Sequence, residues 1–316
     1  MLLQGVILYP IGQIEESFKG ETVMFIDIHA HAYRVQPIYS VRKDYRWAMP
    51  ETLVRFYDKY NVEKGILLPV VSPECNAIQS NEDILEAAER FPGRFVPFCN
   101  IDPRAIFNSP DAPLENHILR YKEAGCKGIG EVMANYPFQH PMMRNLFRAA
   151  EISGLPMTIH VADKIGGCYG IYDEPGLPGL AKTLEDFPKL HIFGHSAAFW
   201  AEISELNSPE DRAGYPKGKV KEGAVARLMR KYPNLIGDLS ANSGANALIR
   251  DPEYAVKFLN EFQDRLCFGM DICLEPFENN IKLIPFLLEL RDTGKISEEV
   301  FRKVAHDNAL RILGVS

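Results

Sequence analysis

Two histidines, His29 and His31, are separated by one residue and end an apolar run that begins at Val23. In a β-strand, side chains two residues apart lie on the same side, roughly 6.6 Å apart at about 3.3 Å per residue. Two imidazoles placed in this way can converge on one metal ion. A bare His-x-His pair is nevertheless a weak motif, and the alternative is a chance pair in a surface loop. A metal site therefore requires further ligands from elsewhere in the chain.

Further side chains that could bind metal end later apolar runs. These candidate ligands are Glu131, His160, His195 and Asp271. Each has a structural alternative, such as an internal salt bridge for Glu131 or a hydrogen-bonded core position for His160. Likewise, His195 could orient substrate without touching metal, and Asp271 could pair with an arginine. The other histidines fall on or near expected helices or at a strand start, and we expect structural roles for them: His117, His140, His191 and His306.

Histidine and carboxylate ligands together suit Zn²⁺, Mn²⁺ or Fe²⁺, with zinc as the first expectation. The six cysteines are scattered without a Cys-x-x-Cys pair, so we expect buried free thiols rather than a structural zinc site. A bound metal would acidify a water enough to supply hydroxide near neutral pH. Asp271 could then ligate the metal and accept the proton of that water. His195 could be a second ligand or a neutral base beside the oxygen that gains charge.

Eight short apolar runs, each followed by a helical pattern, are expected to position these side chains. We expect strands at 25–31, 65–71, 95–101, 127–132, 155–160, 190–195, 235–239 and 266–271. We expect helices at 50–61, 80–91, 114–124, 141–153, 177–187, 224–231, 253–262, 279–291 and 297–313. Strict alternation implies a parallel sheet, and eight units without a linker favour one closed (β/α)₈ TIM barrel over two doubly wound halves. Active sites of such barrels lie at the carboxyl ends of the strands, where the candidate ligands fall.

The remaining segments are expected to flank a single barrel domain within residues 1–316. Residues 1–22 are interpreted as an N-terminal extension with an extra strand, because they lack the basic start of a signal peptide. Residues 201–223 indicate a polar surface insertion, and both segments offer contact surfaces for a homo-oligomer. The net charge of −7 argues against nucleic acid as the main partner. No stretch is long enough to span a bilayer, so we expect a cytoplasmic enzyme with a small-molecule substrate.

His-x-His after the first strand, His after the fifth and sixth, and Asp after the eighth form a pattern that resembles the amidohydrolase superfamily of metal-dependent barrels. Residues 307–314 resemble the C-terminal helix of its amidohydrolase-related branch. That branch contains aminocarboxymuconate-semialdehyde decarboxylase and related non-oxidative decarboxylases, together with lactone and amide hydrolases. The resemblance covers about residues 23–316, and it implies that His195 acts on the water or the substrate. It also implies one zinc ion with these ligands: His29, His31, His160 and Asp271.

Glu131, after the fourth strand, departs from this mononuclear pattern. It resembles the bridging carboxylate of binuclear members of the superfamily, such as the metal-dependent deoxyribonucleases. If Glu131 bridges, the second metal would take Glu131, His160 and His195. The expected metal count is therefore one or two ions. The acidic chain argues against the nuclease activity itself.

The leading expectation is a metal-dependent hydrolase that acts on a small ester, lactone or amide. The first alternative is a lyase that removes CO₂ from an unsaturated or aromatic acid with the same metal and His195. Resorcylate-type decarboxylases often begin with Glu-x-His and are disfavoured, whereas the muconate type keeps His-x-His. A non-catalytic ligand-binding barrel is the second alternative. Arg34 or Lys164 would suit a substrate carboxylate. The candidate substrate contacts, on segments after the strands, are Arg34, Trp47, Lys164, Tyr169 and Trp200.

Overall fold

The structure, a computed structural model, describes residues 24–38, 46–75 and 77–316. The extra strand expected within residues 1–22 lies outside this range. In the described part of the chain, the apolar runs form strands whose residues are mostly buried on both faces. The strands are β1 (Phe25–Ala30), β2 (Val62–Leu67), β3 (Phe95–Pro97), β4 (Ile129–Val132), β5 (Met157–Ala162), β6 (Ile171–Tyr172), β7 (Ile192–His195), β8 (Leu235–Asp238) and β9 (Leu266–Cys267).

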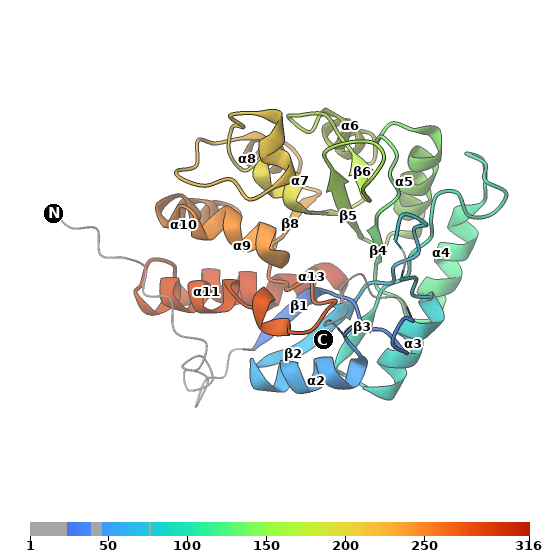
Figure 1. The fold of residues 1–316 in the computed structure, drawn as a ribbon, viewed down its shortest axis with the longest axis horizontal. Helices are drawn as coiled ribbons and strands as arrows, with labels where there is room; N and C mark the ends of the chain where they lie inside the picture. The colour runs from blue at the N-terminus through green and yellow to red at the C-terminus, as the bar shows by residue number, and fades with distance from the viewer. Residues whose placement is uncertain (1–23, 39–45, 76) are drawn as a thin grey trace.

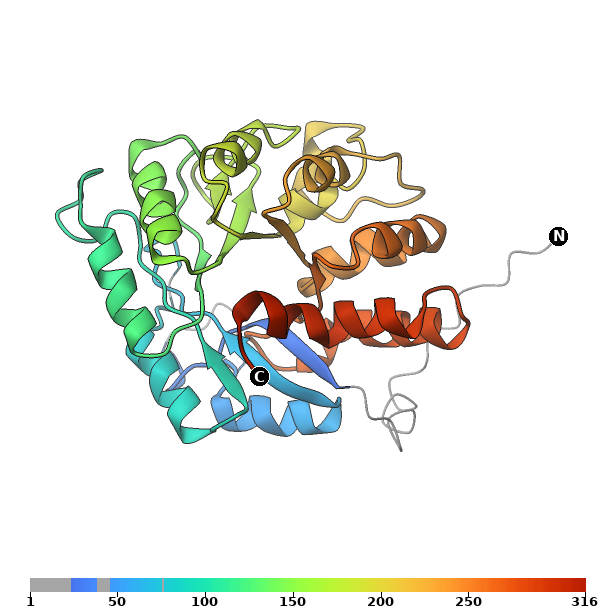
Figure 2. The ribbon, with the colours of Figure 1, turned by 180° about the vertical axis from the view of Figure 1, so that it is seen from behind.

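The strands other than β6 lie side by side and parallel around a ring, with helices on its outside (Figures 1 and 2). The order is β1-β2-β3 in one sheet and β4-β5-β7-β8-β9 in the other. A parallel bridge between Cys99 and Ile129 joins the two sheets at one edge, and a bridge between Ala30 and Ile272 joins them at the other. The predicted (β/α)₈ fold is confirmed. The short strand β6 has no counterpart among the expected strands, and it pairs with β5.

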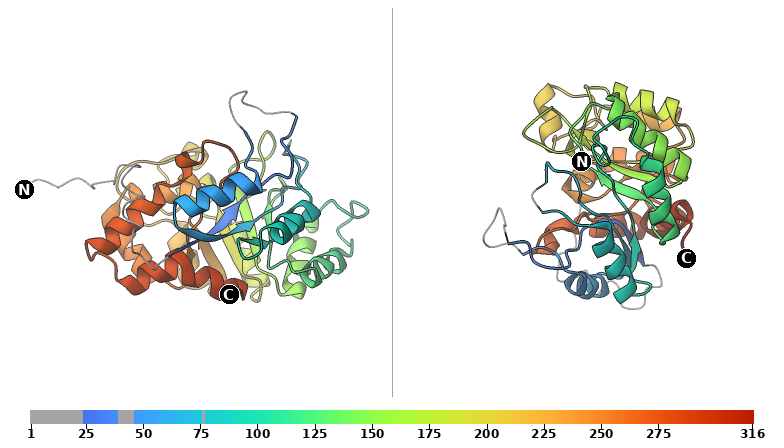
Figure 3. Two further views of the ribbon diagram at one scale, coloured as in Figure 1. Left: turned by 90° about the horizontal axis from the view of Figure 1, so that it is seen from below. Right: turned by 90° about the vertical axis from the view of Figure 1, so that its right-hand side faces the viewer.

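Helices surround the strands because their apolar residues recur on one face, which packs inward (Figure 3). The α-helices are α2 (Pro50–Lys59), α3 (Asn81–Arg90), α4 (Leu114–Glu123), α5 (Pro141–Ser153), α6 (Pro178–Asp186), α7 (Ala197–Ala201), α8 (Ala224–Lys231), α9 (Ala241–Ile249), α10 (Pro252–Glu261), α11 (Leu283–Asp292), α12 (Glu298–Arg302) and α13 (Asn308–Leu313). Shorter or wider helical turns are η1 (Pro209–Ala213), η2 (Phe277–Asn280) and η3 (Lys303–Asp307). None of the described helices is long and apolar enough to cross a membrane.

Apolar packing holds the strands in place on two sides. One cluster includes the strand residues Ile26, Ile66, Val96 and Phe193, and it also contains Leu313 of α13. A larger cluster includes residues of both the strands and the surrounding helices. The polar groups at the carboxyl ends of the strands are therefore mounted on a rigid frame, which is what a precise site requires.

The eighth ring strand and the last helix differ from the expected ranges for one shared reason. β9 ends at Cys267, because the backbone N–H of Phe268 donates to the Val304 carbonyl at 2.8 Å instead of to a neighbouring strand. Val304 belongs to η3, a π-helical turn that interrupts the single helix expected at 297–313. A carbonyl that serves a neighbouring segment fits the widened turn found there.

The insertion at 201–223 is largely exposed, but one residue anchors it in the protein interior. Arg212, in η1, is only 2% exposed. Its Nη1 donates to the Asp173 carbonyl at 2.7 Å, and its Nε lies 2.9 Å from Glu202 Oε1. The segment expected as a polar surface insertion thus contains one buried arginine. A buried guanidinium needs a charge partner that only the folded chain brings close, so composition alone does not reveal it.

Candidate metal centre

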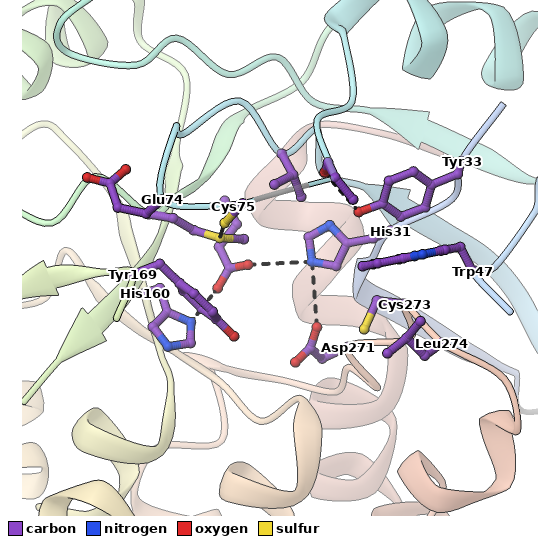
Figure 4. Close-up of a pocket in the computed structure, with 14 residues that line it drawn as sticks. His31, Tyr33, Trp47, Glu74, Cys75, His160, Tyr169, Asp271, Cys273 and Leu274 are labelled. Carbon is purple, nitrogen blue, oxygen red and sulfur yellow. Dashed lines mark hydrogen bonds and ion pairs between the residues drawn. The ribbon is translucent and has the colours of Figure 1, made fainter. Parts of the chain in front are cut away.

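The predicted ligands on β1 face two carboxylates at the carboxyl end of the barrel. The Nε2 atoms of His29 and His31 both lie 3.4 Å from Glu131 Oε2. The same atoms lie 3.7 Å and 3.5 Å from Asp271 Oδ1. Figure 4 shows the ion pair between His31 and Asp271 at the cavity. The two histidines therefore face the same group of carboxylate oxygens, as their spacing in the sequence predicts.

The other oxygen of Glu131 faces a second pair of histidines. Glu131 Oε1 lies 2.7 Å from His160 Nδ1 and 3.9 Å from His195 Nε2. These three residues form one group whose ligand atoms lie within 4.8 Å of one another, and the β1 histidines form another with Asp271. All six predicted ligands thus come together, and Glu131 lies between the two groups.

Hydrogen bonds behind the cluster fix which ring nitrogen each β1 histidine presents. His31 Nδ1 lies 2.8 Å from the Leu68 carbonyl. Because a carbonyl only accepts, Nδ1 carries the proton and Nε2 keeps its lone pair for the cavity. His29 Nδ1 lies 2.7 Å from Asp238 Oδ2, which orients that ring in the same way. Outer partners of this kind position metal-binding imidazoles.

Asp238 is the main functional residue to which sequence reasoning assigned no role. It ends β8, just as the predicted ligands end or follow their strands, so its position was the available sign. Besides the bond to His29, its Oδ2 lies 3.6 Å from His195 Nδ1. Ser240 Oγ lies 2.9 Å from that same nitrogen. Asp238 contacts His29 Nδ1, whereas Glu131 and Asp271 face His29 Nε2, so we assign Asp238 to orienting His29 rather than to binding metal.

A buried atom without a partner tests whether this cluster fits a metal. His29 Nε2 is buried and makes no hydrogen bond to any described residue. An unpaired buried polar atom costs about 1–3 kcal/mol, and coordination would remove that cost. The surrounding donors are imidazoles and carboxylates, the set that zinc and related divalent ions prefer. The residues present therefore fit a divalent metal centre.

Electrostatics in the cluster favour positive charge among the β1 histidines. Burial opposes protonation of His31, but the carboxylates of Asp271 and Glu131 raise its pKa to about 9. Burial likewise opposes protonation of His29, yet Asp238 and then Glu131 hold its pKa well above the ordinary value. For His195, burial and then the charge of His29 lower the pKa to about 4. The same carboxylates that favour protonated β1 histidines would also favour a bound cation.

A cavity of about 270 Å³ opens over the cluster. The rings of Tyr33 and Trp47 lie along one side of it, with their centroids 4.7 Å apart. Glu74 also lines the cavity, but its two oxygens each lie 2.8 Å from the guanidinium of Arg104, which offsets its charge. No lysine or arginine of the described chain lines this cavity. Beyond the metal centre, the cavity therefore suits an uncharged, partly apolar group.

Two thiols lie at this cavity, so the cysteines are not all core residues as expected. Cys75 and Cys273 line it, whereas the other cysteines are distributed over the core and one surface loop. Burial and then the nearby charge of Glu131 raise the pKa of Cys75 to about 12. Cys75 is therefore a neutral thiol at the pH values where the metal ligands act.

The predicted substrate contacts divide into those at the cavity and those away from it. Trp47 and Tyr169 line the cavity, and Lys164 lines an adjoining hollow of about 260 Å³. Arg34 lies on the exposed surface, where its Nε donates to Asp83 Oδ1 at 2.8 Å. Its expected role at the substrate is corrected, because a local carboxylate holds it outside the cavity.

Trp200 also departs from the predicted role. It is 2% exposed and donates its indole N–H to the Asp238 carbonyl at 2.7 Å. The segment after β7 forms the helix α7 rather than an open loop, and this turns the indole into the core. Trp200 therefore supports the segment that carries Asp238 and does not line the cavity.

The histidines expected to be structural lie outside the cluster. His140 accepts a hydrogen bond from the Met142 backbone N–H at the start of α5, and His306 pairs with Glu63. His117 and His191 are exposed. Four of the eight histidines thus lie in the carboxylate cluster, and these four lie outside it.

Comparisons with known proteins agree with this fold. A family model described as amidohydrolase matches residues 26–315. No functionally curated protein matches the sequence.

Several solved structures share the fold at low sequence identity. An uncharacterised TIM-barrel protein from Bordetella bronchiseptica has a TM-score of 0.62 and 16% identity, covering 92% of this chain and 99% of that one. A 5-carboxyvanillate decarboxylase from Sphingomonas paucimobilis has a TM-score of 0.60 and 16% identity, covering 93% and 100%. A probable 2-pyrone-4,6-dicarboxylic acid hydrolase from Acinetobacter baumannii has a TM-score of 0.54 and 15% identity, covering 92% and 99%. At these identities the likeness concerns the fold alone.

Proposed function

This chain belongs to the amidohydrolase family, and we propose that it hydrolyses a small ester, lactone or amide at two divalent metal ions. The observation that carries the proposal is the placement of the Glu131 carboxylate. One of its oxygens faces the β1 histidines, and the other faces His160 and His195. This is the placement expected of a carboxylate shared by two ions.

In this proposal, the β1 histidines and Asp271 would hold one ion, His160 and His195 would hold the other, and Glu131 would contribute to both. Zinc is the proposed metal, because a mixed set of imidazoles and carboxylates suits it. A divalent ion bound here supplies Lewis acidity, which polarises a carbonyl and lowers the pKa of a water to near neutral. Asp238 orients His29, and the Leu68 carbonyl orients His31.

The residues of the chain then handle the substrate and the proton. The Asp271 side chain is 27% exposed at the cavity floor, so it can reach both a water and the substrate. The water oxygen adds to the carbonyl carbon, the carbon–oxygen or carbon–nitrogen bond breaks, and Asp271 passes the water's proton to the leaving oxygen or nitrogen. Tyr33 and Trp47 pack against the apolar part of the substrate.

The test is hydrolysis of a panel of small esters, lactones and amides before and after metal removal. We expect turnover that a chelator abolishes and that added zinc restores. The matched control is Glu123→Gln, since Glu123 has an exposed side chain on α4 and its replacement should leave turnover unchanged. A metal-loaded protein that hydrolyses no class in the panel would contradict the proposal.

A second candidate is metal-dependent decarboxylation of an aromatic or unsaturated acid. The aromatic pair Tyr33 and Trp47 beside an otherwise uncharged cavity favours it, because a flat acid could place its carboxylate at the metal and its ring against these side chains. The similar structures include a 5-carboxyvanillate decarboxylase. Release of CO₂ from benzoate-type acids, without hydrolysis of the panel, would favour this candidate over the first.

A further inference from the structure

The loop that follows β5, residues 163–170, brings an aromatic side chain over the metal centre. Tyr169 lines both the main cavity and the adjoining hollow. Its ring meets the ring of His160 edge-on, with centroids 4.7 Å apart. In Figure 4 its hydroxyl end points into the cavity, toward the side of His160 and Asp271. The residue is 44% exposed, so it lies at the open side of the cavity.

A close approach of the backbone fixes this position. Gly170 has a φ of +106°, and a Cβ at that position would come within 2.8 Å of His160 Cδ2. Only glycine therefore lets the loop return against His160. The Gly170 N–H donates to the Met133 carbonyl at 2.6 Å, which ties the loop end to the segment after β4.

Asn135, from that same segment after β4, clamps the rest of the loop. Its Nδ2 donates to the carbonyls of Lys164 at 3.1 Å and Gly170 at 2.9 Å. Its Oδ1 accepts the Gly166 N–H at 2.6 Å. One side chain thus holds the beginning, the middle and the end of the loop that carries Tyr169. A loop held at three points presents its side chains in a defined direction.

The Tyr169 hydroxyl has no hydrogen-bond partner among the described residues, unlike that of Tyr33, which donates to the Ala77 carbonyl. The hydroxyl is therefore available to donate to a group bound in the cavity, beside the candidate metal ligands His31, Glu131, His160 and Asp271. A donor held in this way is suited to an oxygen that gains negative charge.

We propose that Tyr169 is a catalytic residue that donates a hydrogen bond to the substrate carbonyl oxygen in the transition state, and that Asn135 is its positioning residue. The inference rests on the proposed hydrolysis at the metal centre. Tyr169 forms no covalent bond in the reaction described above. It stabilises the charge that moves to the carbonyl oxygen as water attacks, and it keeps its proton throughout.

The first test compares Tyr169→Phe with the control Tyr172→Phe. The Tyr172 hydroxyl donates to Glu174 outside the main cavity, so its loss should leave turnover unchanged. Loss of one oxyanion donor lowers kcat by about 10²-fold or more, and we expect Tyr169→Phe to do so with KM changed less than about threefold and metal content unchanged. A kcat within about threefold of wild type would overturn the proposal. If metal content falls, the assay is repeated at saturating zinc, and full recovery of kcat there would also overturn it.

A binding measurement separates this inference from the proposed function. Methylphosphonate carries tetrahedral oxygens that resemble the charged transition state, and calorimetry measures its binding without turnover. We expect zinc-loaded Tyr169→Phe to bind it about tenfold more weakly than wild type, since each 1.4 kcal/mol is tenfold. Equal binding would overturn the role of Tyr169 even if hydrolysis is observed. Weaker binding together with no hydrolysis would refute the proposed function and, with it, the catalytic role of Tyr169, and would leave only a hydrogen bond from Tyr169 to a bound oxyanion.

Asn135 is tested through its coupling to Tyr169. We expect Asn135→Ala to lower kcat about tenfold, and we expect the double variant with Tyr169→Phe to match Tyr169→Phe alone, because both changes remove the same interaction. Hydrogen exchange should increase within residues 163–170 in Asn135→Ala. Additive losses of kcat in the double variant would show that Asn135 acts by another route and would refute the positioning role.

Discussion

Two buried charged clusters in this barrel are built in opposite ways. At the insertion, Arg212 lies against Glu202 and the Asp173 carbonyl, so the protein supplies the cation itself. At the carboxyl ends of the strands, Glu131 and Asp271 face only imidazoles, and no lysine or arginine of the described chain pairs with them. The first cluster is complete as a structural anchor, whereas the second offers ligands to a cation from outside. The difference separates a stabilising ion pair from a metal centre.

The largest expected effect comes from removing the carboxylate at the open side of the metal centre. We expect Asp271→Asn to lower turnover by about 10³-fold or more, because the variant lacks both a charged ligand and the proton acceptor. The fold should survive, since the side chain lies at the cavity and not in the core. Steady-state kinetics with circular dichroism checks both points, and activity within about tenfold of wild type would remove the assigned role.

The next largest effect is expected at the cluster formed by Arg212 and Glu202. Arg212→Ala leaves Glu202 buried without its charge partner, which should reduce the free energy of unfolding by about 3–5 kcal/mol. Arg230, whose ion pairs with Glu222 and Glu261 are partly exposed, is the control, and Arg230→Ala should cost less than about 1 kcal/mol. Urea unfolding measures both variants. Equal losses in the two variants would show that the anchor has no special role.

A smaller effect is expected from the residue that orients His29. Asp238→Asn keeps the shape of the side chain but removes its charge, and we expect zinc affinity to fall about 10- to 100-fold. Competition with a chromophoric chelator measures the dissociation constant. Asp264→Asn, on the surface and paired with Lys303, should leave the affinity unchanged. An unchanged affinity in Asp238→Asn would place Asp238 outside the metal centre.

Zinc affinity is also expected to depend on pH. The pKa of His31 is raised to about 9 in the metal-free protein, so below that pH its imidazole holds a proton that zinc must displace. Affinity should therefore fall as pH is lowered from 8 to 6, by about tenfold per unit for each proton released. The Arg212 cluster binds no metal and should show no such linkage. A flat profile of affinity over this range would contradict the electrostatic description of the site.

The elements and the ligands could be predicted because both follow from local patterns. Strand ends of a parallel barrel meet at one edge, so His29, Glu131 and His195 converge although they are far apart in the chain. Asp238 ended a strand as well, but its role depends on facing His29 Nδ1, which only the folded geometry fixes. Trp200 was expected at the substrate, but the segment after β7 is helical, and this places the side chain in the core.

Other features depended on tertiary partners that the sequence does not display. Arg34 was expected at the substrate, but Asp83 holds it on the surface. Arg212 lay in a polar segment whose composition indicates exposure, yet Glu202 makes its burial feasible. The clamp by Asn135 depends on three backbone groups of another loop. Such contacts join segments that no periodicity or motif links.

The most direct measurement of the central claim is the number of metal ions per chain in wild type and in Glu131→Gln. Protein is loaded with zinc, passed over a desalting column and analysed by inductively coupled plasma mass spectrometry, with Glu123→Gln as the control. The placement of Glu131 between two histidine groups predicts two ions per chain in wild type and in the control, and one ion in Glu131→Gln. A single ion in wild type, or a count that Glu131→Gln does not change, would contradict the binuclear centre.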